Sequence, residues 1–184
     1  TPHEWNMTKI LVNMYGIASA MLYLHSHNVI HGDLNPANVL EDENYHPVIC
    51  DFGSSNYKET KSLKADDNKG IIAFTAPEAL EDQQFSAASD SYSFGLVTFS
   101  MLTNQMPFSE ITQIFELVEK LKTGYRPEMS DKIPEVYQNL IKRCWSQEPS
   151  ERPTFSEILS ELKDNPDYII KGIDKYEFLD YVDY

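Results

Sequence analysis

The stretch from Asp90 to Thr103 most constrains what this chain can fold into, because no charged residue follows Asp90 within it. Large apolar side chains recur there without leaving a polar face, which is expected for a helix that other elements cover on most sides. They are Tyr92, Phe94, Leu96, Val97, Phe99, Met101 and Leu102. We therefore predict a central buried helix over Asp90–Thr103, around which the rest of the chain packs.

A second apolar helix is predicted over Thr8–His25, where apolar residues recur at helical intervals. The residues expected on its buried face are Ile10, Met14, Ile17, Met21 and Leu24. Asn28 follows this helix and can adopt the left-handed backbone that often ends one. Further helices are predicted over Pro77–Glu81, Ser109–Lys122, Pro134–Trp145 and Thr154–Lys163. Thr154 and Glu157 have the spacing of a capping box at the start of the last of these.

Two short β-prone runs, Val39–Leu40 and Val48–Cys50, flank a polar stretch and predict one small hairpin. The expected fold class is therefore mainly α with a small β-hairpin. Between Asp51 and Glu78 there is little apolar periodicity, and so long a loop in a compact domain is usually functional or mobile. Cys50 and Cys144 are too few for a disulfide framework, so we expect two reduced, buried thiols.

The charge balance limits the classes of partner. The 184 residues include 15 Lys and Arg against 29 Asp and Glu, a formal net charge of −14. Broad nucleic-acid binding is not expected, because each phosphate contact needs Lys or Arg. No apolar run approaches the roughly 18 residues that span a bilayer, and residues 1–9 do not read as a signal peptide. We therefore expect no membrane segment in this chain and a cytoplasmic location.

Several short motifs occur in a fixed order along the chain. They are His31-Gly32-Asp33-Leu34-Asn35-Pro36-Ala37-Asn38, Asp51-Phe52-Gly53, Ala76-Pro77-Glu78, Asp90-Ser91-Tyr92-Ser93-Phe94-Gly95, Cys144-Trp145 and Arg152-Pro153. In this order and spacing the chain resembles the C-terminal lobe of the eukaryotic protein kinase catalytic domain, from about Thr8 to Lys163. The Cys-Trp pair and the run Glu-Arg-Pro-Thr-Phe resemble the tyrosine-kinase-like group most.

The resemblance implies the C-terminal lobe of the α+β kinase fold without its N-terminal lobe. None of the 7 glycines forms a Gly-x-Gly-x-x-Gly loop, and no Val-Ala-Ile-Lys strand occurs. Those elements hold the ATP phosphates in the family. The expected division is residues 1–163 as the kinase C-terminal lobe and residues 164–184 as an acidic, Tyr-rich tail, which we expect to pack weakly on the lobe.

The resemblance also implies phosphoryl transfer from ATP to protein Ser or Thr, with Tyr left open as an acceptor. Asp33 matches the catalytic base that accepts the proton of the substrate hydroxyl. Asn38 and Asp51 match the residues that bind Mg²⁺ and through it ATP, in keeping with the oxygen ligands that Mg²⁺ prefers. Asn35 stands where the family usually has a catalytic Lys that touches the transferred phosphate. The implied cofactors are ATP and Mg²⁺.

Other matches to the family concern support of the site. Glu78 and Arg152 match a buried ion pair, and Asp90 matches a residue that binds backbone N–H groups of the catalytic loop. His31 is expected to pack beneath that loop. A metal site built from His25, His27 and His31 is the alternative, although zinc usually requires a fourth ligand.

The chain departs from the family pattern at several positions. Gly32 replaces an Arg that normally pairs with a phosphate on the activation loop, so we expect activity not to depend on phosphorylation of that loop. Ile71 and Phe74 stand where the family usually has Thr and Tyr, which leaves the class of substrate open. The loop hydroxyls that remain as candidate phosphorylation sites are Ser54, Ser55, Tyr57, Thr60 and Ser62.

Two functions therefore stay open. The first is a protein kinase that is weak or inactive as this chain alone, because the N-terminal lobe is missing. The second is a degenerate kinase that binds substrates or partner kinases without transferring phosphate. Protein substrates or partner kinases and a nucleotide are the expected partners. The acidic surface fits either a preference for basic peptides or a simple solvated face, and nothing in the sequence assigns an oligomeric state.

Overall fold

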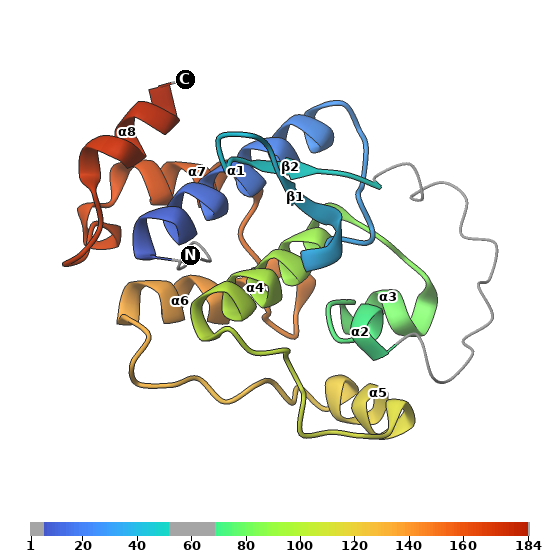
Figure 1. Ribbon diagram of the computed structural model, residues 1–184. Coiled ribbons are helices and arrows are strands. Elements are labelled where there is room, and N and C mark those ends of the chain that lie inside the picture. Colours follow the sequence, from blue (N-terminus) through green and yellow to red (C-terminus); the bar gives the residue numbers. More distant parts are fainter. Residues whose placement is uncertain (1–5, 52–68, 184) are drawn as a thin grey trace.

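The computed structural model describes residues 6–51 and 69–183 and consists mainly of helices (Figure 1). The helices are α1 (Met7–Ser26), α2 (Lys69–Ile72), α3 (Pro77–Asp82), α4 (Ala87–Thr103), α5 (Ile114–Lys122), α6 (Glu135–Cys144), α7 (Phe155–Asp164) and α8 (Lys175–Asp183). Short 3₁₀ turns are η1 (Pro36–Asn38), η3 (Pro149–Glu151) and η4 (Pro166–Tyr168). Two strands, β1 (Val39–Glu41) and β2 (Pro47–Ile49), form one small sheet. The predicted mainly α class with a small hairpin is confirmed.

Helix α4 lies at the centre of the molecule, as its composition predicts (Figure 1). Its residues from Ser89 to Phe99 are all buried, and it packs against α1 and α6. The helix begins three residues before the predicted start at Asp90. The reason is a capping box, in which the Ser86 hydroxyl accepts from the Ser89 N–H and the Ser89 side chain accepts from the Ser86 N–H.

Helix α1 is the second core helix, and all five residues predicted on its inner face are buried. The Asn6 side chain caps it by accepting from the Lys9 N–H, and Asn28 beyond its end has the predicted left-handed backbone, with φ 58°. Its length of 20 residues and mean hydropathy of 1.2 are enough to cross a membrane, contrary to the expectation that no stretch approaches such a span. However, 61% of its most apolar window is buried inside the protein, which is typical of a core helix.

The hairpin is antiparallel, with Val39 opposite Ile49 and Leu40 opposite Val48. Val39 and Ile49 are partly buried against the core, whereas Leu40 and Val48 face outward and are 52% and 47% exposed. The prediction that Cys50 lies in a buried strand is wrong, because β2 ends at Ile49 and Cys50 is only half-buried. The pairing of strands stops at Val39 and Ile49, because Asn38, the next residue on the partner side, belongs to the turn η1.

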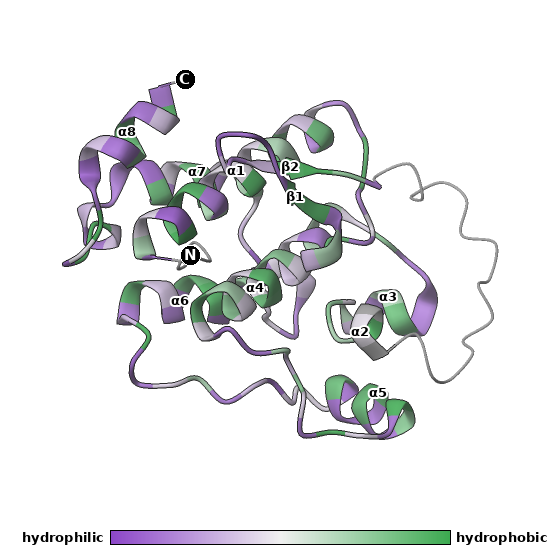
Figure 2. Cartoon of the chain, in the orientation of Figure 1, coloured by the Kyte–Doolittle hydropathy of each residue, from purple (hydrophilic) through white to green (hydrophobic). Residues whose placement is uncertain are grey.

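The remaining predicted helices form, with corrected ends. Helix α5 begins at Ile114 rather than Ser109, because Gln113 has an extended backbone, with φ −99° and ψ 126°, which cannot belong to a helix. The capping box of Thr154 and Glu157 is confirmed at the start of α7. Hydrophilic and hydrophobic residues are interleaved along α5 and α6 (Figure 2), as expected for helices with one buried face.

Cys144, near the end of α6, is fully buried, as predicted. Burial raises the pKa of its thiol to about 12, so the side chain stays neutral at physiological pH. It lies close to Gly95 in α4, where a methyl group would press against the Cys144 side chain and the α6 backbone. Gly95 therefore allows α4 and α6 to approach each other closely.

The C-terminal tail packs more firmly than predicted. Tyr168 in η4 and Phe178 in α8 are fully buried, and the Tyr137 hydroxyl donates to the Tyr168 carbonyl oxygen at 2.8 Å. The Phe178 ring meets the edge of the Tyr15 ring of α1 at 5.8 Å. The tail is thus part of the core, because its apolar side chains find an uncovered face of α1.

Truncation of Phe178 tests this packing. Phe178→Ala should lower the free energy of unfolding by about 3–5 kcal/mol, since it leaves a cavity where the side chain was 1% exposed. The matched control is Phe115→Ala, because Phe115 is 78% exposed and its loss should change stability by no more than about 0.5 kcal/mol. Urea unfolding measures both values, and equal effects would mean that the tail frays.

Candidate functional site

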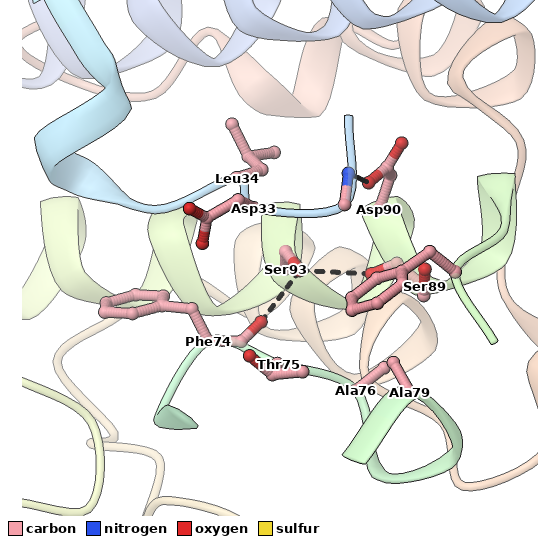
Figure 3. Close-up of a pocket in the computed structure, with 11 residues that line it drawn as sticks. Asp33, Leu34, Phe74, Thr75, Ala76, Ala79, Ser89, Asp90 and Ser93 are labelled. Atoms are coloured by element: carbon pink, nitrogen blue, oxygen red, sulfur yellow. Dashed lines mark hydrogen bonds between the residues drawn. The ribbon is translucent and has the colours of Figure 1, made fainter. Parts of the chain in front are cut away.

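The loop that leads from α1 to the hairpin is held by the carboxylate of Asp90. Asp90 is fully buried in α4, and its Oδ2 and Oδ1 accept from the backbone N–H groups of His31 and Gly32 at 2.9 and 2.8 Å. Figure 3 shows this carboxylate beside the loop that carries Asp33. The predicted role of Asp90 as a cap for this loop is confirmed. A buried carboxylate needs such donors, since an unpaired buried charge is costly.

Among the described residues, His25 is a third donor to the Asp90 carboxylate. This contact was not predicted from the sequence. The His25 Nε2 atom lies 2.8 Å from Asp90 Oδ2, at the end of α1. The signal was present in the sequence, because His25 follows Met21 by four residues and so shares the buried face of the helix. His25 therefore links α1, α4 and the loop at one point.

His31 lies beneath the loop as predicted, and its two ring nitrogens have different partners. The Asp33 N–H donates to Nδ1 of His31 at 3.2 Å. Because Nδ1 is an acceptor, the ring proton is assigned to Nε2. Nε2 then donates to the Cys50 carbonyl oxygen at 3.1 Å. A neutral imidazole thus ties the loop to the end of the hairpin.

The three histidines considered as a metal site are directed to separate partners. His25 binds Asp90, His31 binds Cys50, and the His27 ring lies against the Tyr23 carbonyl oxygen at 2.8 Å. Within residues 6–51 and 69–183, no cluster of three His, Cys, Asp or Glu side chains suits a metal ion. His25 and His31 therefore support the loop, whereas His27 is bonded to the end of its own helix.

Asp33, Asn35 and Asn38 are brought together by hydrogen bonds within the loop. Asn35 Nδ2 donates to the Asp33 carbonyl oxygen at 2.9 Å and to its carboxylate Oδ1 at 3.2 Å. Asn38 Nδ2 donates to the same carbonyl oxygen at 2.7 Å. The amide of Asn35 therefore orients the Asp33 carboxylate, and the amide of Asn38 keeps its Oδ1 as the remaining acceptor.

Asp51 lies at the other end of the hairpin, next to this group. It directly follows Cys50, whose N–H donates to the Asn38 carbonyl oxygen at 3.0 Å. Asp51 is exposed and has a left-handed backbone with φ 62°. The hairpin thus joins the chain segments of Asn38 and Asp51, as predicted. Phe52, Gly53 and the candidate phosphorylation sites Ser54 to Ser62 lie outside the described residues.

Gly32 occupies a position that suits glycine. Its φ is +71°, and a methyl group there would lie 3.3 Å from Cδ1 of the Phe85 ring. Phe85, in the connection between α3 and α4, therefore packs over the backbone at the position where the resemblance predicts an Arg. The sequence did not indicate Phe85, because the contact joins residues that are far apart in the chain.

The segment before α3 forms the opposite wall of a narrow pocket beside Asp33. Ser93 of α4 donates to the Phe74 carbonyl oxygen at 2.7 Å, which fixes this segment on the central helix (Figure 3). The pocket also touches Gly32 and Ala76 and has a volume of about 10 Å³, enough for about one water molecule. Ile71 belongs to the short helix α2.

Glu78 and Arg152 form the predicted ion pair, although only Arg152 is buried and the Glu78 side chain is 24% exposed. The Arg152 Nη1 and Nη2 atoms donate to Glu78 Oε1 and Oε2 at 2.6 and 2.9 Å. The guanidinium also lies 5.0 Å from the ring centre of Tyr92, whose pKa is raised to about 12 by burial. The pair joins the start of α3 to the chain before α7, so it fixes the segment around α3 on the core.

Comparison with known proteins agrees with this arrangement. The chain matches a family model described as "Protein tyrosine and serine/threonine kinase" over residues 2–162. It is 32% identical to the serine/threonine/tyrosine-protein kinase HT1 of Arabidopsis thaliana, covering 94% of this chain and 44% of that protein. It is also 39% identical to the dual specificity protein kinase shkA of Dictyostelium discoideum, covering 80% of this chain and 29% of that protein.

A mouse relative extends the comparison. The receptor-interacting serine/threonine-protein kinase 4 of Mus musculus is 33% identical, covering 94% of this chain and 24% of that protein. This chain thus spans less than half the length of each of these relatives.

Alanine at Gly32 tests the crowding by Phe85. Gly32→Ala and the control Gly124→Ala both place a methyl group on a left-handed backbone, with φ values of +71° and +83°. Each should lose about 1–2 kcal/mol of unfolding free energy for that reason. Of these two positions Gly32 is the crowded one, since the nearest atom to a methyl group at Gly124 is 3.9 Å away. Gly32→Ala should therefore lose about 1 kcal/mol more, and equal losses in urea unfolding would contradict the contact.

Proposed function

This chain belongs to the protein tyrosine and serine/threonine kinase family, and from that premise we propose that it is the C-terminal lobe of a kinase domain that phosphorylates proteins on Ser or Thr. Residues 1–163 would form the lobe and residues 164–184 its C-terminal extension. Asp33 would serve as the catalytic base, with Asn35 as its positioning residue. Asn38 and Asp51 would hold Mg²⁺ and through it the ATP phosphates. Transfer to Tyr stays open, as does the predicted cytoplasmic location.

The observation that supports this function best is that the loop with Asp33 and Asn38 meets the chain before Asp51 at one end of the hairpin. The Asp33 carbonyl oxygen binds the Asn38 amide at 2.7 Å, and the Asn38 carbonyl oxygen binds the N–H of the residue before Asp51 at 3.0 Å. Phosphoryl transfer depends on alignment and charge neutralisation more than on covalent chemistry. Asp33, held in place, and the oxygen ligands of Asn38 and Asp51 beside it would contribute to the alignment of the substrate and to the neutralisation of charge.

The side chains present fit Mg²⁺ by their chemistry. A carboxylate and an amide oxygen are hard oxygen ligands of the kind that this ion takes. Because Asn38 Nδ2 is bound to Asp33, the amide presents Oδ1 as its ligand atom. Asp51 is exposed and its carboxylate reaches solvent at the same end of the hairpin. When bound, Mg²⁺ would neutralise charge on the ATP phosphates.

Asp33 is suited to receive the proton of a substrate hydroxyl. Its backbone is fixed through Nδ1 of His31, and its carboxylate Oδ1 is held by Asn35 at 3.2 Å. In the family pattern a Lys at position 35 would add a positive charge near the transferred phosphate. Here the amide contributes orientation without charge, which could lower the rate by the amount typical of one lost transition-state donor, about 10²–10³-fold.

An apolar surface beside Asn38 and Asp51, the proposed Mg²⁺ ligands, supports nucleotide binding. Leu40 and Val48 are cross-strand neighbours on the outer face of the hairpin and are about half exposed. Such a pair at the edge of a site suits the flat face of a nucleotide base. The glycine-rich loop that holds phosphates in kinases does not occur in the 184 residues, so we expect these residues alone to transfer phosphate weakly.

A second candidate function is a binding module that does not transfer phosphate. Gly32 and Asn35 favour it, because each replaces a cationic side chain of the family pattern. In this case protein substrates or partner kinases would bind the same lobe, and Asp33 would have no chemical role. The two functions differ in one measurable property, which is transfer that depends on Asp33.

Substitution of Asp33 tests the proposed chemistry. Asp33→Asn should lower phosphoryl transfer to a general protein substrate by about 10²–10⁴-fold, because the amide cannot accept the hydroxyl proton. The dissociation constant for Mg–ATP should stay within about twofold, since Asp33 is not among the proposed metal ligands. The measurement uses radiolabelled ATP and the natural protein that contains these residues.

The exposed Asp131→Asn is the control and should leave both values unchanged. Near-normal transfer by Asp33→Asn would contradict the base assignment. Mg–ATP-independent binding of protein partners, with no transfer by the unaltered protein, would instead support the second function.

A further inference from the structure

The C-terminal helix α8 packs against the turn of the hairpin that carries Asn38 and Asp51 at its ends. The ring centre of Tyr181 in α8 lies 4.6 Å from that of His46, the residue before β2. Helix α8 begins at Lys175, beyond residues 2–162 that match the kinase family model. The contact is therefore made by a segment that the family match does not account for.

Three elements meet at Gly16 in the middle of α1. A methyl group at this position would overlap both the Tyr181 hydroxyl of α8 and Cγ of Pro47, the first residue of β2. Glycine weakens the interior of a helix because it has more freedom to lose than other residues. Its presence in this long helix is explained by the close approach of α8 and β2 to the α1 backbone.

Helix α8 is fixed on α1 by aromatic and polar contacts along its length. The Tyr15 ring of α1 meets the Phe178 ring at 5.8 Å and the Tyr181 ring at 6.3 Å, both edge to face. Just before α8, the Asp174 N–H donates to the Thr8 hydroxyl at 2.8 Å. Figure 1 shows α8 beside the N-terminal part of the chain. Tyr181 is thus held by α1 on one side and presses on the hairpin with the other.

The hairpin connects this contact to the proposed site. Pro47 pairs with Glu41 in the strand register, and Cys50 lies three residues further on, roughly 10 Å along an extended chain. The Cys50 N–H binds the Asn38 carbonyl oxygen, and its carbonyl oxygen binds His31. A shift of the turn would therefore move both ends of the hairpin relative to the loop.

We propose that Tyr181 is a positioning residue, through which α8 braces the β1–β2 hairpin and so keeps Asn38 and Asp51 in place for Mg–nucleotide. The effect on nucleotide rests on the function proposed above. The brace itself does not, because it concerns only contacts within the chain.

Amide hydrogen exchange on this chain, followed by NMR, tests the brace. In Tyr181→Ala, the amides of Asp42 and Cys50 should exchange about tenfold faster or more, since both are bonded within the hairpin. Tyr176→Ala is the matched control, because it removes the same ring from the same helix at a site that is 81% exposed. Equal hairpin exchange in the two variants would overturn the proposal. Equal acceleration in the hairpin and in α6 would also overturn it, because it would indicate general destabilisation.

Gly16→Ala is a second variant, which tests whether α8 and β2 meet at the α1 backbone if Tyr181→Ala does not fold. Alanine stabilises a helix relative to glycine. If Tyr181 and Pro47 did not approach Gly16, the change would therefore slow amide exchange in α1 and leave exchange in the hairpin unchanged. With the contact, the added methyl group displaces Tyr181 or Pro47, and the Asp42 and Cys50 amides exchange faster. Unchanged hairpin exchange in Gly16→Ala would overturn the brace.

Titration with Mg–ATP tests the link to the site. Tyr181→Ala should bind it about three- to tenfold more weakly than Tyr176→Ala, the range expected for a residue that acts through packed neighbours. Equal affinities would overturn the effect on nucleotide. If the unaltered chain binds no Mg–ATP while hairpin exchange still changes as predicted, nucleotide binding by this chain fails and the brace stands.

Discussion

The buried carboxylate of Asp90 is the interaction on which the rest of the site depends. It lies inside a helix that is apolar on nearly every side, where an unpaired charge would cost several kcal/mol. The backbone N–H groups of His31 and Gly32 and the ring of His25 supply its hydrogen bonds. Since those donors belong to α1 and to the following loop, satisfying one carboxylate fixes where Asp33 stands relative to the core.

Local patterns in the sequence predicted the parts of the fold that depend on local chemistry. Apolar spacing predicted α1 and α4. The Asp90 cap and the Glu78–Arg152 pair join distant residues, and only the resemblance to the kinase family predicted them. The misjudged features depend on contacts between distant residues or on turn geometry. The early start of α4 arises from the Ser86 capping box, and the burial of Phe178 requires an uncovered face on α1. Neither is visible in the periodicity of the segment concerned.

The departures from the kinase pattern are accommodated within the loop without changing its support. Gly32 takes a left-handed backbone under Phe85, and Asn35 uses its amide to hold Asp33. Both substitutions remove a positive charge, so the loop keeps its shape but has fewer cations to offer a phosphate. This combination is consistent with a slow kinase and with a binding module, which is why the chemistry of Asp33 rather than the fold distinguishes them.

The most direct test of this account is amide exchange in Asp90→Asn, because the amide retains the shape but loses the charge and one acceptor. The account predicts that the His31 and Gly32 amides exchange about 10–100-fold faster, as expected for losing hydrogen bonds to a charged group. The amides of Leu96 to Phe99, deep in α4, should stay slow because the Ser86 cap is unaffected. Unchanged exchange at His31 and Gly32 would contradict the claim that this carboxylate organises the site.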